Sequence, residues 1–391
     1  MRYFLLAGEA SGDNLGAGLI TEIRRLDPGA EFAYWGGDGM RAAAGGLAPK
    51  QHLDALAFMG FAEVVINLRT ILGLLAAAKR DVAAFAPDVL VCVDYPGFNL
   101  RLARWAKDRG IRVDFYVSPQ IWAWRRGRVH KIAAATDRLL CILPFERDFY
   151  AGYGYDVDYV GHPLPRRVDE HPRPARLEIV DPAGALPADG PVLAVLPGSR
   201  RQEVRALLAA MMAGVAGFAA RRLRERPAAL PYRVVLAAAP VLDDGFLDGL
   251  CREHGIGYVR NAYDVLSVAE LACVTSGSAT LETALFGVPQ VVCYRGSAIS
   301  VAIARRVVKV EYIALPNLIL GEAVVPELIQ RAANAGAIAA ALADLSEGPA
   351  RQRAEAGYER LRAALAPYDA AARAAALIVE DAGGPAASDA N

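Results

Sequence analysis

Two carboxylates stand directly after apolar runs that predict buried strands. Glu9 follows the run in MRYFLLAG, and Asp94 follows Val89–Val93. In parallel α/β sheets the residues just after the strands contact ligands, because the strands end at one common edge. A carboxylate at such an edge is costly unless it meets a ligand or a partner charge. Both residues are therefore candidate general bases, although Asp94 could instead cap the turn at Pro96–Gly97, a role for which Asn99 is also available.

Two loops combine glycine with hydroxyl side chains, each between a predicted strand and a predicted helix. One is LPGSR at 196–200, and the other is TSGSATLE at 275–282. Backbone N–H groups at a helix start suit a diphosphate, and an arginine adds charge-assisted hydrogen bonds. Each loop alone could be a plain turn with a helix cap, but the pair favours ligand contact. The residues expected at this anion site are Gly198, Ser199, Arg200, Ser276, Gly277 and Ser278.

The elements that position these residues follow an α/β pattern, in which Val-, Leu- and Ile-rich runs alternate with segments of helical period. We expect two Rossmann-like, doubly wound parallel sheets. In the first half the expected strands are 2–8, 32–36, 88–93, 111–117 and 138–142, and the expected helices are 14–26, with Asp13 as its cap, 63–85, 99–109, 128–135 and 145–152. In the second half the expected strands are 192–196, 232–238, 257–260, 271–275 and 288–294, and the expected helices are 201–223, 244–254 and 278–286.

Domain boundaries follow from composition. The proline-rich stretch 163–191 predicts a linker after a first sheet that ends near Val160. We expect a first domain at 1–167, a second at 168–348, helices at 349–380 that return to the first domain, and a disordered tail at 381–391.

Composition excludes some functions. The formal net charge of zero argues against a general nucleic-acid binder. Residues 101–138 nevertheless hold ten Lys or Arg against three Asp, a local net charge of +7 that suits an anion, a membrane surface or simply a solvated helix face.

The apolar stretch at the start of the chain is too short for the core of a signal peptide, so we expect a cytosolic protein. Odd in number and without CxxC spacing, the cysteines are expected to be buried reduced thiols: Cys92, Cys141, Cys251, Cys273 and Cys293.

The order of several short motifs resembles the lipid-A-disaccharide synthase family up to about residue 330. The motifs are GEASGD at 8–13, DYPGFN at 94–99, SPQIWAWR at 118–125, LPFE at 143–146, VGHPL at 160–164, LPGSR at 196–200, SGSATLE at 276–282, LPNLI at 315–319 and PELIQ at 326–330.

The resemblance implies the GT-B fold and transfer of diacylglucosamine from UDP to lipid X, a diacylglucosamine 1-phosphate, with inversion to a β-1,6 linkage. It points to Asp94 as the base, with Glu9 as the alternative, and in GT-B enzymes a glutamate placed like Glu282 binds ribose. Asn317 is expected near the nucleotide or within a turn. No metal or other cofactor is expected. The acceptor side is assigned Ser11, Asn99, Gln120, Trp122, Trp124, Arg125, Arg128 and His162, the last with a structural role as the alternative.

Peripheral attachment to the cytoplasmic face of the inner membrane is a further expectation. Trp122, Trp124 and Arg125 belong to an aromatic and basic cluster suited to lipid headgroups. A helix over 63–80 has a broad apolar face that suits either the core or lipid, and 300–310 mixes apolar and basic residues. A homodimer is left open. The competing hypotheses are another GT-B enzyme, such as an epimerase or a muropeptide-type transferase, and a non-catalytic nucleotide or lipid carrier.

Overall fold

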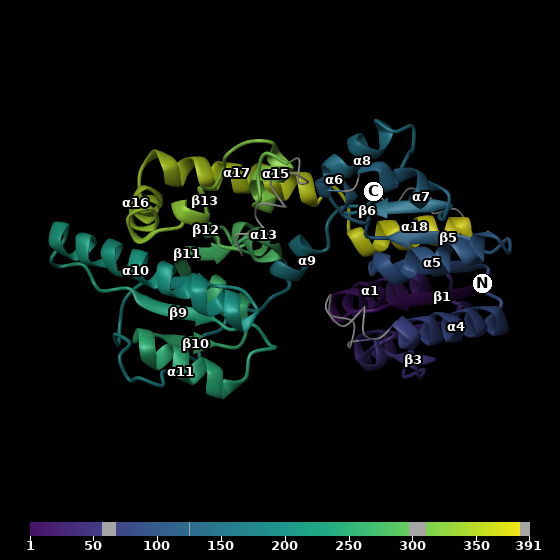
Figure 1. Ribbon diagram of the computed structural model, residues 1–391, viewed down its shortest axis with the longest axis horizontal. Coiled ribbons are helices and arrows are strands. Elements are labelled where there is room, and N and C mark those ends of the chain that lie inside the picture. Colours follow the sequence, from purple (N-terminus) through teal and green to yellow (C-terminus); the bar gives the residue numbers. More distant parts are fainter. Residues whose placement is uncertain (57–67, 125, 297–309, 384–391) are drawn as a thin grey trace. The chain divides into compact units, whose positions relative to one another are not determined.

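The chain forms two compact units, shown in a computed structural model that describes residues 1–56, 68–124, 126–296 and 310–383 (Figure 1). The first unit consists of Met1–Pro163 and Ala364–Asn391, and the second consists of Leu164–Ala363. The boundaries expected from composition were 168 and 348. The chain enters the second unit slightly earlier, at Leu164, and leaves it later, after Ala363.

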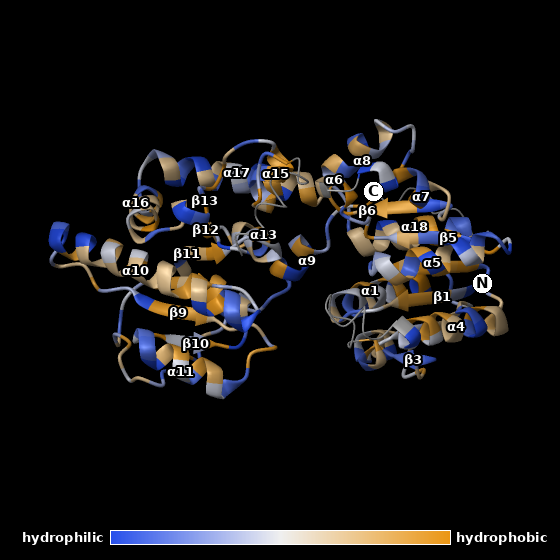
Figure 2. Cartoon of the chain, viewed as in Figure 1, coloured by the Kyte–Doolittle hydropathy of each residue, from blue (hydrophilic) through white to orange (hydrophobic). Residues whose placement is uncertain are grey.

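The first unit contains a seven-stranded parallel sheet whose central strands, such as β1 and β4, are apolar runs buried on both faces, as a covered parallel sheet requires. Figure 2 shows hydrophobic residues concentrated along strands such as β1 and β6. In spatial order the strands are β3 (Gln51–His52), β2 (Glu31–Gly36), β1 (Arg2–Ala7), β4 (Val89–Val93), β5 (Arg112–Tyr116), β6 (Arg138–Cys141) and β7 (Asp158–Tyr159).

Helices cover both faces of this sheet, and alternate strand residues point to each layer. One layer contains α1 (Ala10–Leu26), α2 (Asp38–Ala43) and α18 (Ala370–Asp381). The other contains α4 (Leu68–Phe85), α5 (Pro96–Lys107), α6 (Ile121–Trp124), α7 (Val129–Ala133) and α8 (Pro144–Ala151), and short 3-10 turns lie at η1 (Leu53–Ala55) and η2 (Arg126–Arg128).

The second unit repeats this architecture around a six-stranded parallel sheet. In spatial order its strands are β10 (Gly257–Val259), β9 (Arg233–Ala237), β8 (Val192–Leu196), β11 (Ala269–Thr275), β12 (Gln290–Tyr294) and β13 (Glu327–Ile329). Its helices are α9 (Leu164–Asp169), α10 (Arg201–Glu225), α11 (Asp244–His254), α12 (Ala262–Leu266), α13 (Ser278–Leu285), α15 (Leu315–Leu320), η3 (Gln330–Ala332), α16 (Ala335–Ser346) and α17 (Pro349–Leu365), the last of which runs into the first unit.

Helix α10 is, within the described residues, the one helix long and apolar enough to cross a membrane. It packs instead on the second sheet and on α16, burying residues such as Leu208 and Met211. At Gly214 a side chain is excluded, because an added Cβ would lie 2.5 Å from Ile338. These contacts are those of a core helix.

Several expectations need correction. Helix α1 begins at Ala10 rather than at residue 14, and the start of the expected linker 163–191 forms α9. Part of the helix expected at 63–85, residues 63–67, lies outside the described residues, as do almost all of 300–310 and the tail from 384. All five cysteines are buried free thiols, which confirms that prediction.

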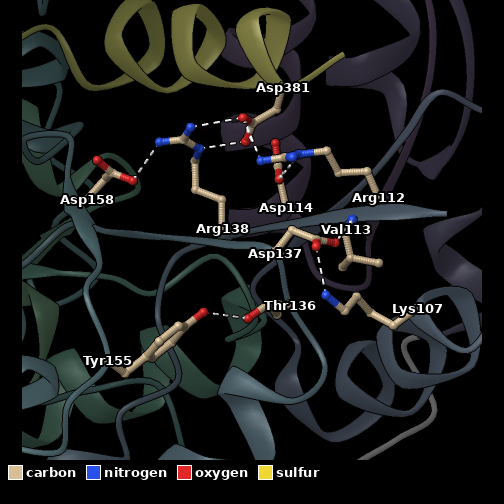
Figure 3. A network of polar contacts seen from close by, with 10 residues as sticks. All are labelled: Lys107, Arg112, Val113, Asp114, Thr136, Asp137, Arg138, Tyr155, Asp158 and Asp381. Atoms are coloured by element: carbon tan, nitrogen blue, oxygen red, sulfur yellow. Dashed lines mark hydrogen bonds and ion pairs between the residues drawn. The ribbon is translucent and has the colours of Figure 1, made fainter. Parts of the chain in front are cut away.

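Helix α18 is held on the first unit by an arginine and carboxylate network (Figure 3). Asp381, the last residue of α18, accepts from Arg138 at 2.5 and 2.8 Å and pairs with Arg112 at 2.6 Å, so the expected disordered tail does not begin at 381. Burial acts to raise the pKa of Asp381, but these hydrogen bonds outweigh it and the net shift is downward. Beneath them, burial and the charge of Asp381 raise the pKa of Asp114 well above its usual range, against the lowering effect of both arginines.

The network predicts opposite effects for its two aspartates. Asp381→Asn should lower the free energy of unfolding by about 2 kcal/mol, because it leaves two arginines undercompensated. Asp114→Asn should gain stability relative to wild type as pH rises. Since the folded state binds more protons at Asp114 than the unfolded state does, wild-type stability falls as pH rises above about 4, and the variant escapes this cost. Urea unfolding at low and high pH measures both effects, and an Asp114→Asn variant that loses stability relative to wild type as pH rises contradicts the raised pKa of Asp114.

Candidate functional site

The carboxyl edge of the first sheet carries strained backbone. Asp94, Tyr95 and Val117 have positive φ angles of 47°, 50° and 73°, and they directly follow β4 and β5. Sheet hydrogen bonds hold them there, from Asp94 N to Tyr116 O at 2.9 Å and from Val117 N to Leu140 O at 3.0 Å. This conformation is rare for residues other than glycine, above all for valine, and such strain clusters at functional sites. The backbone therefore marks the same edge as the sequence.

Asp94 is half-buried at this edge. Burial raises the pKa of its carboxyl group, and the charge of Glu9 adds to this, whereas a hydrogen bond from the Tyr95 backbone opposes it. A carboxylate with a raised pKa binds a proton more readily near neutral pH, as a general base must. Glu9 lies two residues after the neighbouring strand β1, is exposed, and makes no side-chain cap to α1.

The ends of β1 and β4 are in direct contact. An added Cβ at Gly8 would lie 2.3 Å from the ring of Tyr95, so the ring rests on the backbone that carries Glu9. Glycine at this position thus brings the two candidate bases to adjacent strand ends.

Asn99, expected near a ligand, and Asp13, expected to cap a helix, instead hold backbone segments together. Asn99 is fully buried, and its Nδ2 contacts the carbonyl oxygens of Leu6, Val93 and Asp94 at 3.3, 3.3 and 2.7 Å. It fixes the Asp94 turn and is not accessible to an acceptor. Asp13 does not cap α1, because it accepts hydrogen bonds from the backbone of the α2 start, including Gly37 N at 2.6 Å.

Trp122 also differs from expectation. Its ring packs edge-on to Phe145 with centroids 5.0 Å apart, and its Nε1 donates to Glu146 at 3.2 Å. With 7% of its surface exposed, Trp122 is a core residue rather than a headgroup contact. The side chain of Trp124 and the whole of Arg125 lie outside the described residues.

The remaining acceptor-side candidates divide by exposure. Ser11, Gln120 and Arg128 are exposed in the first unit. His162 follows β7, and its backbone N–H donates to Leu365 O at 2.8 Å, where the chain re-enters this unit. Burial lowers the pKa of His162 to about 4, so its imidazole is neutral at pH 7. This setting fits the structural alternative for His162.

The second unit contains a pocket of about 910 Å³ at the carboxyl ends of four adjacent strands. Six of the residues expected to bind the nucleotide line it: Gly198, Ser199, Ser276, Gly277, Ser278 and Glu282.

Two helices start at this pocket. Gly198 and Gly277 adopt φ angles of 109° and 150°, which favour glycine; Gly198 lies three residues before the start of α10, and Gly277 is the N-cap of α13. The start of a helix leaves backbone N–H groups without partners inside the helix, and the helix dipole favours negative charge there. The pocket can therefore bind a diphosphate without a metal.

Glu282 forms the acidic wall of this pocket. Tyr263 donates its hydroxyl hydrogen to Glu282 Oε1 at 3.0 Å. Burial raises the pKa of Glu282, while the Tyr263 hydrogen bond and the charge of Arg167 lower it. One carboxylate oxygen is thus positioned by Tyr263, and the group can accept from hydroxyls of a ligand.

Part of this pocket was not anticipated. Arg167 and His171 come from the segment expected to be a linker, and Asn261 and Tyr263 follow β10. His171 Nε2 lies 2.9 Å from Asp264 Oδ1, and its ring meets the ring of Tyr263 at 5.4 Å. The rule that ligands contact strand ends could have indicated Asn261 and Tyr263. No sequence signal indicated Arg167 and His171, because their segment is rich in proline and was expected to be a linker.

Two expected nucleotide contacts lie elsewhere. Arg200 is not among the residues that line the pocket; its exposed guanidinium pairs with Glu203 at 3.0 Å. Asn317 is buried, donates to Val325 O and Glu327 Oε1, and accepts from Val324 N. Asn317 stabilises the turn before β13, which agrees with the alternative expectation that it lies within a turn.

Solved structures confirm the architecture. The protein is similar to a putative UDP-N-acetylglucosamine 2-epimerase from Listeria monocytogenes, with a TM-score of 0.64, 11% identity and coverage of 97% of this chain and 95% of that one. It is also similar to the glycotransferase of kitacinnamycin, with a TM-score of 0.63, 18% identity and coverage of 97% and 98%. Fold and site define a GT-B protein with two Rossmann-like units.

Sequence comparison gives the family. Residues 3–379 match the model of the lipid-A-disaccharide synthetases. The chain is 40% identical to a lipid-A-disaccharide synthase of Syntrophus aciditrophicus, covering 95% of this chain and 96% of the relative, and 37% identical to one of Geobacter metallireducens, covering 97% of each. The chain belongs to this family and is a glycosyltransferase. Membership favours glycosyl transfer over the hypotheses of an epimerase and of a non-catalytic carrier.

The pocket geometry predicts that Tyr263→Phe weakens binding of UDP about fivefold, the value of one lost hydrogen bond. Pyrophosphate affinity should not change, because the hydrogen bond that is lost goes to the carboxylate of Glu282 and not to the backbone N–H groups of the glycine loops. Tyr232→Phe is the matched control, since Tyr232 donates to Glu270 at 2.8 Å at the other end of the same sheet. Calorimetric titration measures both affinities, and equal losses in the two variants would refute the assignment.

Proposed function

We propose that this protein condenses UDP-diacylglucosamine with lipid X to give the lipid A disaccharide phosphate and UDP. The observation that carries the proposal is the pocket of the second unit, where two glycine loops, two helix starts and Glu282 offer the groups that a uridine diphosphate requires. The names of the related family members support the choice of substrates.

In the proposed reaction Asp94 removes the proton from the acceptor hydroxyl. The acceptor oxygen attacks the anomeric carbon as the bond to the diphosphate breaks, so a single in-line step inverts an α-linked donor into a β-glycoside. The raised pKa of Asp94 and its position at a strand end support this role. Glu9, whose charge contributes to that pKa, is the alternative base.

The leaving diphosphate gains negative charge during the reaction. The N-termini of α10 and α13 stabilise that charge, because hydrogen-bond donors fixed in place by a fold need no rearrangement during the reaction. Arg200, at the N-cap of α10 and next in sequence to the pocket residue Ser199, pairs with Glu203 in this structure; in the proposed reaction it turns to the diphosphate and supplies a further cation. Glu282 accepts from the ribose hydroxyls.

The two proposed bases are separable by substitution. Asp94→Ala should lower kcat by about 10²- to 10⁴-fold and leave UDP affinity unchanged, because the nucleotide pocket lies in the other unit. Glu9→Gln should have a smaller effect. Release of UDP from the two lipid substrates measures turnover, and an Asp94→Ala variant as active as wild type would exclude Asp94 as the base.

We also propose that the protein is cytoplasmic and attaches to the cytoplasmic face of the inner membrane. Leu72 of α4 is 55% exposed beside the exposed Arg69, whereas Leu75 of the same helix is buried in the core. The basic stretch 101–138 includes the exposed Arg128. A homodimer stays a prediction from sequence.

Membrane attachment predicts cosedimentation with anionic liposomes at low salt and release at high salt, because exposed charges are screened. Leu72→Ser should weaken this binding, and Leu223→Ser, an exposed leucine of α10, is the control. A wild-type protein that stays in the supernatant at low salt would disprove attachment.

A further inference from the structure

A buried carboxylate occupies the carboxyl edge of the first sheet and has no part in the mechanism above. Glu146 lies in the first turn of α8, just after β6, and 1% of its surface is exposed. A glutamate at this helix position often folds back to the start of its own helix, as Glu146 does by accepting from Leu143 N at 3.1 Å. That bond uses one oxygen and does not require burial.

The other contacts of Glu146 reach the loop after the neighbouring strand. Trp122 donates its indole N–H to Oε1 at 3.2 Å, and the Ser118 hydroxyl also hydrogen-bonds to the carboxylate. Tyr150 lies 2.9 Å from the same hydroxyl, which places Ser118 between Tyr150 and Glu146. Residues 118–122 are therefore held at both ends by one carboxylate.

The held segment starts at a strained residue. Val117, with its φ of 73°, turns the chain out of β5 directly before Ser118. A β-branched residue persists in this conformation only when its surroundings fix it. The sheet bond to Leu140 fixes one side, and the contacts of Ser118 fix the other. Within the segment Pro119 is buried and Gln120 is exposed, next to the strand end that carries Asp94.

We propose that Glu146 is a positioning residue for glycosyl transfer: its carboxylate holds the segment 118–122 and so fixes Gln120 at the strand end beside Asp94, where the acceptor sugar binds. This inference rests on the proposed function. It also links two motifs of this sequence, because Glu146 of LPFE binds Ser118 and Trp122 of SPQIWAWR.

The hold depends on charge. Burial raises the pKa of Glu146 to about 7, although the hydrogen bonds from Leu143, Ser118 and Trp122 lower it. The titratable neighbours are Cys141 of β6, Tyr159 of β7 and Tyr150 of α8; burial raises the pKa of each, so they stay neutral near pH 7. Arg147, next in sequence, is exposed. Protonation of Glu146 removes negative charge from the carboxylate that accepts the hydrogen bonds from Leu143, Ser118 and Trp122.

The test is the pH dependence of kcat/KM for lipid X in the full-length protein. Wild-type kcat/KM should fall about tenfold from pH 8 to pH 6, as for a group that must be ionised. Glu146→Gln should lose this dependence and be up to about 100-fold slower at pH 8, because the segment is misplaced. UDP affinity should not change, and Glu270→Gln, in the second unit, should behave as wild type.

Two further variants keep the buried carboxyl group of Glu146 and predict the direction in which the midpoint of the pH profile moves. Trp122→Phe and Ser118→Ala each remove a donor that lowers the pKa of Glu146, so each should move the midpoint of the pH profile upward. These variants decide the matter if Glu146→Gln does not fold. An unchanged midpoint in both, or a Glu146→Gln variant that is slower at every pH with the wild-type midpoint, would overturn the proposal.

A substrate-free measurement separates this proposal from the proposed function. The fluorescence of Trp122, taken as the difference between wild type and Trp122→Phe, should titrate with a midpoint near 7 that Ser118→Ala raises. If the wild type releases no UDP at any pH, the proposed function fails while this titration still reports the hold on the segment. If the fluorescence does not titrate, the hold itself is wrong.

Discussion

The site depends on how parallel strands end. The hydrogen bonds of β4, β5 and β6 continue one residue past the strands, through Asp94 N and Val117 N, and the chain then turns through left-handed backbone. Such turns cost free energy, which the hydrogen bonds and the buried core on both faces of the sheet offset. They determine where Asp94 and the segment after Val117 lie.

Both units use aromatic side chains to control carboxylates at these edges. Trp122 donates to Glu146, Tyr263 donates to Glu282, and the ring of Tyr95 rests on the backbone that carries Glu9. For Glu146 and Glu282, burial raises the pKa of the carboxyl group, and the hydrogen bond from the aromatic side chain limits the rise. In the proposed function the same arrangement serves nucleotide binding in one unit and acceptor binding in the other.

The sheets and the nucleotide loops could be predicted from local sequence, because buried parallel strands are continuous apolar runs and glycine with hydroxyl residues follows them. Side-chain roles that depend on distant partners could not. Asn99 and Asn317 look like ligand contacts until their buried hydrogen bonds are known, and Trp122 looks like a headgroup residue until Glu146 covers its indole N–H. Likewise, Arg167 and His171 join the pocket through tertiary contacts that a proline-rich segment does not reveal.

The central claim is that UDP binds the pocket of the second unit while Asp94 of the first unit receives the acceptor proton. A crystal structure of the protein with UDP and lipid X tests it most directly. The account predicts the diphosphate on the loops at Gly198 and Gly277, and the attacking hydroxyl about 3 Å from an Asp94 carboxylate oxygen. A diphosphate bound elsewhere, or an acceptor hydroxyl whose nearest carboxylate is not Asp94, would contradict it.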